Sequence, residues 1–291
     1  MAIRVRLAGG LGNQLFQLNS ALILNDSLNL NEKIIINNSY LNSYASKRES
    51  LISNFFGFDY TGSKVFFYDN KEIAMNIRLS KLIGYMVEKN LSGVLNYNSL
   101  ISSINHLIGN LFLDGYYQNN YPFKVHLKLQ SVKDNILNHA SEILDKLGLE
   151  KDFYAMHVRR GDYLTDKSAR KIFNIIEMPF YKKINNNYFN HDLPLIIFSD
   201  DLRIAKLFAE EFRGIHFYDK GLNILDEFSL MAKASGIAIS NSTFPWWATI
   251  LGGAKPYGIH SPKNWYKKKS YNDKNTLNKI KIINVEDNKI C

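Results

Sequence analysis

The residues best suited to chemistry lie in one short segment, His-Val-Arg-Arg-Gly-Asp-Tyr, at positions 157–163. The segment follows the apolar run 153–156 and reaches a turn at Gly161, which predicts a buried strand that ends here. Beyond the carboxyl end of such a strand, side chains line the crevice where α/β proteins bind ligands. Two adjacent arginines there, Arg159 and Arg160, are costly without an anion, and a guanidinium binds phosphate oxygens in pairs. The segment therefore predicts a site for a phosphorylated ligand.

The same arginines also have a plainer interpretation. Ion pairs with Asp162 or with carboxylates elsewhere would hold them equally well, since structural ion-pair networks look the same in sequence. The tripeptide Arg-Gly-Asp at 160–162 matches a cell-adhesion sequence, but three residues that follow an apolar strand carry little information. The segment alone leaves phosphate binding and structural ion pairing both open.

The second half of the chain alternates between strand and helix patterns, which predicts βαβ units and a mostly parallel sheet. Besides the strand before Arg159, the expected elements are strands at 195–198, 215–217, 236–239 and 257–259 and helices at 179–189, 202–212, 226–234 and 244–251. Two strands end in polar segments, Ser199-Asp200-Asp201 and Ser240-Asn241-Ser242-Thr243. Parallel strands end at one edge of a sheet, so these segments are expected to share a crevice with His157 and the arginines.

Several of these polar residues have a structural alternative. Ser242 and Thr243 precede a helix that begins at Phe244, where they could cap the helix or help its free amides bind an anion. Asp226 begins another helix, and on spacing alone an N-cap role is favoured. The pair Trp246-Trp247 is most simply explained by core packing, although one ring could contact the sugar or base of a ligand.

The first half of the chain begins with a strand at 3–7, a glycine-rich loop and a helix. The loop fits neither a dinucleotide fingerprint, because Leu15 occupies the third glycine position, nor a phosphate-binding P-loop. Asn13 and Gln14 suit a hydroxyl-rich ligand, but Asn13 could simply cap the helix. After a strand at 33–36, the region 37–120 is irregular, with helical stretches around 73–87, and is rich in aromatic and amide side chains of the kind that commonly line carbohydrate sites. A helix at 131–147 ends at Gly148 and places a domain boundary near residue 150.

Composition indicates an ordinary soluble protein of 291 residues, 46% hydrophobic and 22% charged. No apolar run approaches the roughly 20 residues that span a bilayer, and the amino terminus does not resemble a signal peptide, so a cytoplasmic location is expected. The only cysteine is Cys291. Neither Asp-x-Asp nor a His/Cys cluster is present, so no metal is expected and a bound diphosphate would be neutralised by arginine and helix amides.

The formal charge of +9 is concentrated near the carboxyl terminus, where residues 255–291 carry nine lysines against three acidic residues. Such a tail could attract an anionic membrane or a nucleic acid, or could be a solvated surface strip.

Four blocks of the sequence together resemble the bacterial α-1,2-fucosyltransferases of glycosyltransferase family 11. The blocks are GGLGNQLFQ at 9–17, HVRRGDY at 157–163, FSDD at 198–201 and SNSTFPWW at 240–247. They occur in the family's order and span nearly the whole chain. The resemblance implies an α/β fold with GT-B architecture, in which two Rossmann-like domains, 1–150 and 151–291, enclose the active site. The first would mainly bind the acceptor and the second would bind GDP-fucose.

The resemblance further implies an inverting, metal-independent transfer of L-fucose from GDP-β-L-fucose to the 2-hydroxyl of a sugar, usually galactose. Arg159 would hold the β-phosphate and stabilise the departing GDP. Arg160 would support the loop or the phosphate, and His157 would lie against the nucleotide. Asn13 would reach the fucose or the acceptor from the first domain.

The other implied donor contacts come from three segments. Asp226 stands where related α-1,6 enzymes have a guanine-reading aspartate, and would accept from the guanine edge. Ser242, Thr243 and Phe244 would close around the diphosphate. Ser199, Asp200 and Asn241 complete the expected donor site. Where the family usually has serine and glycine, this chain has Pro245 and Ala248.

The general base is left between two candidates. An inverting displacement needs a base within reach of the acceptor hydroxyl, and Asp162 is the first choice and His157 the second. A loose, oxocarbenium-like transition state would need little help from either.

The sequence as a whole predicts a galactoside α-1,2-fucosyltransferase that acts on O-antigen or another lipid-linked glycan, with its basic tail near the anionic inner membrane. The alternatives are a GDP-sugar transferase with a different acceptor position and a sugar-binding module without turnover. A nucleic-acid-binding protein is disfavoured by the acidic and amide residues at the strand ends.

Overall fold

The computed structural model describes residues 2–27, 33–37, 41, 110–113, 115–118, 125–217, 221–253, 255, 257–274, 277 and 283–285. They fall into two compact units, Met1–Gln130 and Ser131–Cys291. Most of the region 37–120, the helical stretch expected around 73–87 and Cys291 lie outside the described residues. The boundary expected near residue 150 falls just after helix α6 (Lys133–Leu147), which belongs to the second unit.

The first unit contains a parallel sheet in the order β2-β1-β3. Its described elements are β1 (Ala2–Arg6), α1 (Leu11–Ser27), β2 (Lys33–Asn37), β3 (Asn110–Leu113) and α5 (Leu127–Gln130). The expected strand, glycine turn and helix at the amino terminus are confirmed. Gly9 has φ of 77°, and a Cβ there would lie 2.3 Å from Nδ2 of Asn13, so this turn accepts only glycine.

The second unit is built on a six-stranded parallel sheet in the order β6-β5-β4-β7-β8-β9. The strands are β4 (Tyr154–Val158), β5 (Leu195–Ser199), β6 (Ile215–His216), β7 (Gly236–Ala238), β8 (Ile259–Pro262) and β9 (Ile283–Val285). The chain extends the sheet from β4 through β5 to β6, and then returns to add β7 on the other side of β4. Ligands of open α/β sheets bind beyond the carboxyl ends of the strands at such a reversal, here between β4 and β7.

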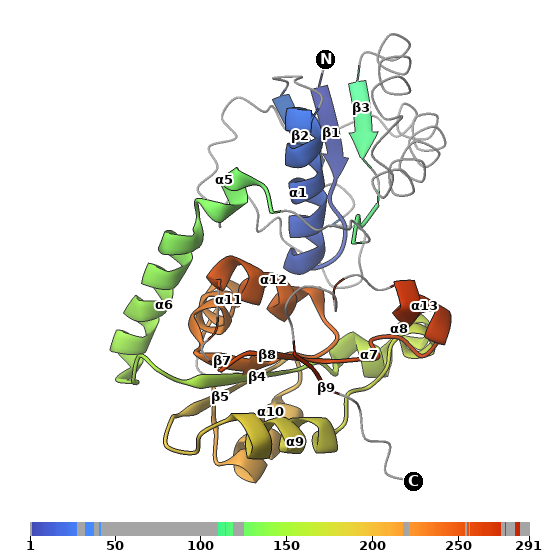
Figure 1. Ribbon diagram of the computed structural model, residues 1–291. Coiled ribbons are helices and arrows are strands. Elements are labelled where there is room, and N and C mark those ends of the chain that lie inside the picture. The colour runs from blue at the N-terminus through green and yellow to red at the C-terminus, as the bar shows by residue number, and fades with distance from the viewer. Residues whose placement is uncertain are drawn as a thin grey trace. The chain divides into compact units, whose positions relative to one another are not determined.

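Helices cover both faces of this sheet (Figure 1). One face carries α9 (Met178–Tyr188) and α10 (Leu202–Phe212), and the other carries α6, α11 (Ile224–Lys233) and α12 (Thr243–Gly252). Every residue of β4 and β5 is buried, as expected for central strands covered on both sides. The core under α9 and α10 joins Met156 and Ile197 to Tyr181 and Phe208.

Most expected elements of the second unit are confirmed, but some element ends differ and several elements, including strand β9, were not expected. Helix α11 begins at Ile224 with Asn223 as its N-cap, so the expected N-cap role of Asp226 is wrong. Strand β8 begins at Ile259, two residues later than expected, because Gly258 has φ of 84° and turns the chain. The short helices α7 (Gly161–Thr165), α8 (Lys167–Ile172) and α13 (Lys269–Lys274) were not expected. They are too short to show a helical period in sequence.

Candidate functional site

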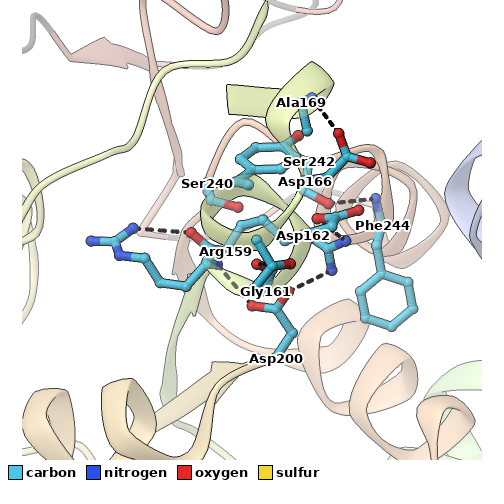
Figure 2. Close-up of polar contacts among 12 residues, drawn as sticks. Arg159, Gly161, Asp162, Asp166, Ala169, Asp200, Ser240, Ser242 and Phe244 are labelled. Atoms are coloured by element: carbon cyan, nitrogen blue, oxygen red, sulfur yellow. Dashed lines mark hydrogen bonds and ion pairs between the residues drawn. The ribbon is translucent and has the colours of Figure 1, made fainter. Parts of the chain in front are cut away.

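Arg159 lies directly after β4, with its guanidinium between two carboxylates (Figure 2). Nη2 is 2.7 Å from Oδ1 of Asp162, and Nη1 is 2.9 Å from Oδ2 of Asp200. The guanidinium carbon is also 5.6 Å from the centre of the Tyr163 ring, a cation–π distance. About a quarter of the Arg159 side chain is exposed, at 24%. Arg159 is therefore a positioned cation that a ligand at the carboxyl edge of the sheet can reach.

Arg160 differs from its neighbour because its side chain is turned into the protein. It is 5% exposed, and its guanidinium donates to the backbone carbonyls of Arg159, at 3.0 Å, and Ile176, at 2.8 Å. Nη2 is also 3.8 Å from a carboxylate oxygen of Glu177. Of the two roles considered for Arg160, these contacts favour support of the loop over binding of phosphate.

Asp200 connects β5 to the arginine segment. Its Oδ1 accepts the backbone N–H of Arg160 at 2.8 Å, while its Oδ2 contacts Arg159. Gly161 makes this approach possible, since a Cβ there would lie only 2.1 Å from Oδ2 of Asp200. The preceding Ser199 is buried, and its hydroxyl accepts the backbone N–H of Asp201 at 3.2 Å. Asp201 caps α10 through its side chain, so the two adjacent aspartates have separate tasks.

His157 is the last but one residue of β4 and is almost fully buried. Its Nδ1 lies 2.8 Å from the hydroxyl of Ser240, and the Phe244 ring is 6.1 Å away, centre to centre. Burial, and then the charge of Arg159, lower the pKa of His157 to about 3. The imidazole is therefore neutral at working pH and a very weak base, which argues against the general-base role considered for it.

The segment after β7 brings three predicted site residues to the same edge. Ser242 is the N-cap of α12 and accepts the backbone N–H of Phe244 at 3.4 Å, so its capping role is confirmed. Thr243 is the first residue of that helix and is partly buried. Phe244 packs on the ring of Phe228, 5.5 Å between centres. The amino end of α12 therefore lies beside His157 at the carboxyl edge of the sheet.

Asn241 is buried and holds neighbouring loops together instead of facing the crevice. Its Nδ2 donates to the carbonyls of Asn174, at 2.9 Å, and Trp265, at 2.8 Å. Its own carbonyl accepts the hydroxyl of Tyr163 at 2.9 Å. Trp246 and Trp247 are also fully buried, which confirms core packing for both.

Asp226 uses both carboxylate oxygens within the protein. Oδ2 accepts the backbone N–H of Asn223 at 2.9 Å in a capping box, and Oδ1 lies 2.8 Å from Nε2 of His139 on α6. To accept from guanine, as expected from the sequence, Asp226 would have to share or exchange these partners.

Glu227 is a further residue of interest that the sequence did not single out. It lies in the first turn of α11, where burial, followed by the charges of Asp200 and Asp226, raises its pKa to about 7. Acidic residues are common at helix starts, so its proximity to Asp200 becomes visible only when β5 and α11 are placed in the fold.

In the first unit, the predicted site residue Asn13 lies inside the first turn of α1, so it is not the N-cap. Its Oδ1 accepts from Nε2 of Gln118 at 2.9 Å. Gln14 is buried and donates to the carbonyl of Gly9 at 3.1 Å. The amide of Gln14 thus stabilises the glycine turn, whereas that of Asn13 contacts Gln118. The expected contact of Asn13 with fucose or acceptor stays a prediction.

Two kinds of feature, a group of metal ligands and a membrane-spanning helix, are absent from the described part of the chain. No group of three or more His, Cys, Asp or Glu side chains is arranged to hold a metal ion there. In the same residues, no helix is both long and apolar enough to cross a bilayer.

Comparison with known proteins supports the resemblance seen in sequence. The chain is 26% identical to the O-antigen biosynthesis glycosyltransferase WbnK of Escherichia coli, over 96% of this chain and 99% of the relative. It is 25% identical to an alpha-1,2-colitosyltransferase of Escherichia coli, over 92% of this chain and 93% of the relative. Among solved structures, POFUT1 in complex with GDP-fucose aligns with a TM-score of 0.48 and 11% identity, over 89% of this chain and 97% of that chain. The fucosyltransferase NodZ from Bradyrhizobium aligns with a TM-score of 0.46 and 10% identity, over 86% and 93%.

A family comparison agrees with the relatives and covers almost the whole sequence. Residues 2–284 match the family described as Glycosyl transferase family 11. The chain therefore belongs to glycosyl transferase family 11.

Proposed function

We propose that this chain transfers L-fucose from GDP-β-L-fucose to the 2-hydroxyl of an acceptor sugar, a galactoside in a cell-surface polysaccharide such as O-antigen, with inversion and without a metal. Family membership supports the glycosyl transfer. The relatives support an O-antigen acceptor and a 1,2 linkage, because one is named an O-antigen biosynthesis glycosyltransferase and the other an alpha-1,2-colitosyltransferase. The donor rests on the sequence blocks that resemble α-1,2-fucosyltransferases.

The observation that carries the proposal is Arg159, a partly exposed guanidinium at the point where the strand order reverses. A departing GDP gains negative charge on its β-phosphate in the transition state, and a fixed cation placed there lowers the barrier. Arg159 carries one positive charge and contacts two carboxylates. A diphosphate that binds the guanidinium therefore replaces at least one of them.

Asp162 is the carboxylate better suited to move. Its side chain is 40% exposed and belongs to short helix α7, whereas the Asp200 side chain is 24% exposed and also binds the backbone of Arg160. When the donor takes the place of Asp162 on Arg159, the Asp162 carboxylate would accept the proton of the acceptor hydroxyl. Asp162 thus remains the proposed general base, in preference to His157.

The amino end of α12 supplies the second part of the proposed donor site. Backbone amides and hydroxyls at a helix start favour an anion without any metal, and Ser242, Thr243 and Phe244 lie at the same edge of the sheet as His157. We further propose that the two units form a GT-B enzyme with Asn13 on the acceptor side.

The first experiment measures GDP release from GDP-fucose with a panel of galactosides in the presence of EDTA. We expect acceptor-dependent release by the wild type, a loss of about 100- to 1,000-fold for Arg159→Ala, and no effect of EDTA. Arg203→Ala is the matched control, because Arg203 is 90% exposed and, among the residues that the structure describes, pairs with Asp201 alone, so it should leave release unchanged. Linkage analysis of the product then tests the 2-hydroxyl, and the anomeric configuration tests inversion.

Two results would contradict the proposal. Absence of GDP-fucose binding would remove the donor assignment, and the name of the second relative makes a nucleotide-linked colitose the next donor to test. Tight donor binding without turnover on every acceptor, with Arg159→Ala changing affinity alone, would indicate a sugar-binding module.

A further inference from the structure

A basic surface adjoins the donor site in the second unit. It is formed by α8 and by the loop that leads into α13, and six exposed cationic side chains lie on these two segments: Lys167, Arg170, Lys171, Lys267, Lys268 and Lys269. The two segments are almost 100 residues apart in the sequence, so the sequence does not show that their charges combine.

Backbone contacts hold the two segments together. The N–H of Lys267 donates to the carbonyl of Ile172 at 2.9 Å, and Phe173 pairs with Tyr266 in an antiparallel bridge. Asn174 adds a side-chain bond to the carbonyl of Tyr266 at 2.9 Å. Figure 1 shows α8 and α13 side by side. We call this surface, with its six cations, the α8–α13 basic surface.

None of the six cations forms an ion pair with a carboxylate whose side chain the structure describes, whereas Lys182 pairs with Glu211 at 2.6 Å elsewhere in the unit. The nearby carboxylate of Asp166 is used as the N-cap of α8 and accepts two backbone N–H groups. One further acidic residue, Asp273, lies on α13. The six cations still exceed the acidic residues on these short segments, and such an excess of like charge favours an anionic partner.

Exposed apolar side chains lie on α8, on α13 and on the neighbouring helix α7. Leu164 is 42% exposed, Ile172 39% and Tyr271 45%. Leucine and isoleucine make no favourable contact with the phosphate groups of a nucleic acid. At a bilayer interface, by contrast, aliphatic side chains and tyrosine insert below the level of the lysine and arginine side chains. The combination therefore fits anionic lipid better than nucleic acid.

We propose that the α8–α13 basic surface docks the protein on an anionic phospholipid bilayer. Each lysine or arginine near such a surface strengthens binding about fivefold, so six of them supply a substantial peripheral attachment. The attraction acts over roughly 8 Å at physiological salt, which requires the side chains to lie at the lipid surface itself.

Docking in this way would place the donor site near the lipid. The ring of Tyr163 stacks on Phe173 at 4.6 Å, Phe173 lies 5.5 Å from Tyr266, and Arg159 lies over Tyr163. Three rings thus separate the arginine from the α8–α13 basic surface. The benefit, access to an acceptor carried on a lipid, rests on the proposed function, but the docking itself does not.

The test is sedimentation of the full chain with phosphatidylcholine vesicles, with and without phosphatidylglycerol. The first variant combines Lys267→Gln, Lys268→Gln and Lys269→Gln, and the second combines Lys167→Gln, Arg170→Gln and Lys171→Gln. The control combines Lys146→Gln, Lys151→Gln and Lys206→Gln, which removes the same charge from exposed positions on α6, before β4 and on α10.

We expect binding only to vesicles that contain phosphatidylglycerol, and a weakening of roughly 100-fold in each of the first two variants but not in the control. The midpoint of thermal unfolding should stay at the wild-type value in all three variants, which verifies that they fold. Equal weakening in the control would overturn the proposal in favour of a general effect of net charge. Absence of vesicle binding by the wild type, or tighter binding to random DNA lost in the same variants, would also overturn it. Because vesicle binding is measured without substrate, failure of the proposed donor or acceptor leaves this test unaffected.

Discussion

Asp200 holds both the side chain of Arg159 and the backbone that carries it. One carboxylate oxygen lies 2.9 Å from Nη1 of Arg159, and the other accepts the N–H of Arg160 at 2.8 Å. In sequence Asp200 was a candidate for direct contact with the donor. Its geometry assigns it to positioning Arg159, the cation proposed to bind phosphate.

Replacement of Asp200 tests this positioning role. Asp200→Ala loses both bonds and should lower kcat/KM for the donor about 10- to 100-fold. Asp200→Asn keeps an oxygen for the N–H of Arg160 and should retain more activity. Steady-state kinetics of GDP release would measure both, and equal losses in the two variants would mean that the bond to the backbone contributes little.

Gly161→Ala tests the close approach of Asp200. The added Cβ would lie 2.1 Å from Oδ2, so the carboxylate must move away from Arg159. We expect a loss of activity similar to that of Asp200→Ala. In the double variant Gly161→Ala/Asp200→Ala the clash is absent, so the second substitution should add little to the first. Additive losses would indicate that Gly161 is needed for another reason.

His157 should make the protein sensitive to acid. Its pKa is lowered to about 3 in the folded protein by burial and by Arg159, and in the unfolded chain the ordinary value is near 6.5. The unfolded chain therefore binds the proton more readily between these values, and stability falls as pH decreases from about 6.5 towards 3.

Urea unfolding at several pH values, for the wild type and His157→Gln, measures this effect. The variant should be less stable overall because the site is buried, but its stability should fall less steeply as pH decreases. Part of the slope should persist, because burial also lowers the pKa of His260. Identical slopes in the two proteins would contradict the assignment.

Ionisation of Glu227 should change the stability of the protein with pH in the opposite direction to that of His157. Its pKa is raised to about 7 in the folded protein, so the unfolded carboxyl loses its proton first and stability falls as pH rises from about 4.5 to 7. Glu227→Gln removes this penalty and should be more stable than the wild type above pH 7 by at most about 3 kcal/mol, and of similar stability near pH 4. Thermal unfolding at both pH values would show whether the gain in stability appears only at the higher pH. A gain that is independent of pH would contradict the raised pKa of Glu227.

The sequence predicted the framework of the site because its signals are local. A buried strand before Arg159, a polar segment at the end of β5 and a capped helix after β7 are each visible within a few residues. The parallel sheet then follows from the alternation of strands and helices, and it brings His157, Asp200 and Ser242 to one edge.

Individual roles were harder to predict because they depend on partners that are distant in sequence. Arg160 turns inward because the carbonyl of Ile176 is available to it, and Asp226 is engaged by His139, 87 residues earlier. Asn241 is held by carbonyls from two loops. Nothing local distinguishes these residues from ligand-facing ones, since the same side chains suit both tasks.

The two carboxylates around Arg159 have a consequence for selectivity and turnover. A lone phosphate ion gains only the contact with the guanidinium and must displace an anion that is already tethered there, so it is a weak competitor. A nucleotide sugar can displace the same anion because its base and sugar add contacts of their own. In the proposed reaction, Asp162 would pair with Arg159 again once it had given up the proton taken from the acceptor, and this would favour departure of GDP. In the proposed reaction, the carboxylates around Arg159 would therefore weaken binding of simple anions and would favour release of the product GDP.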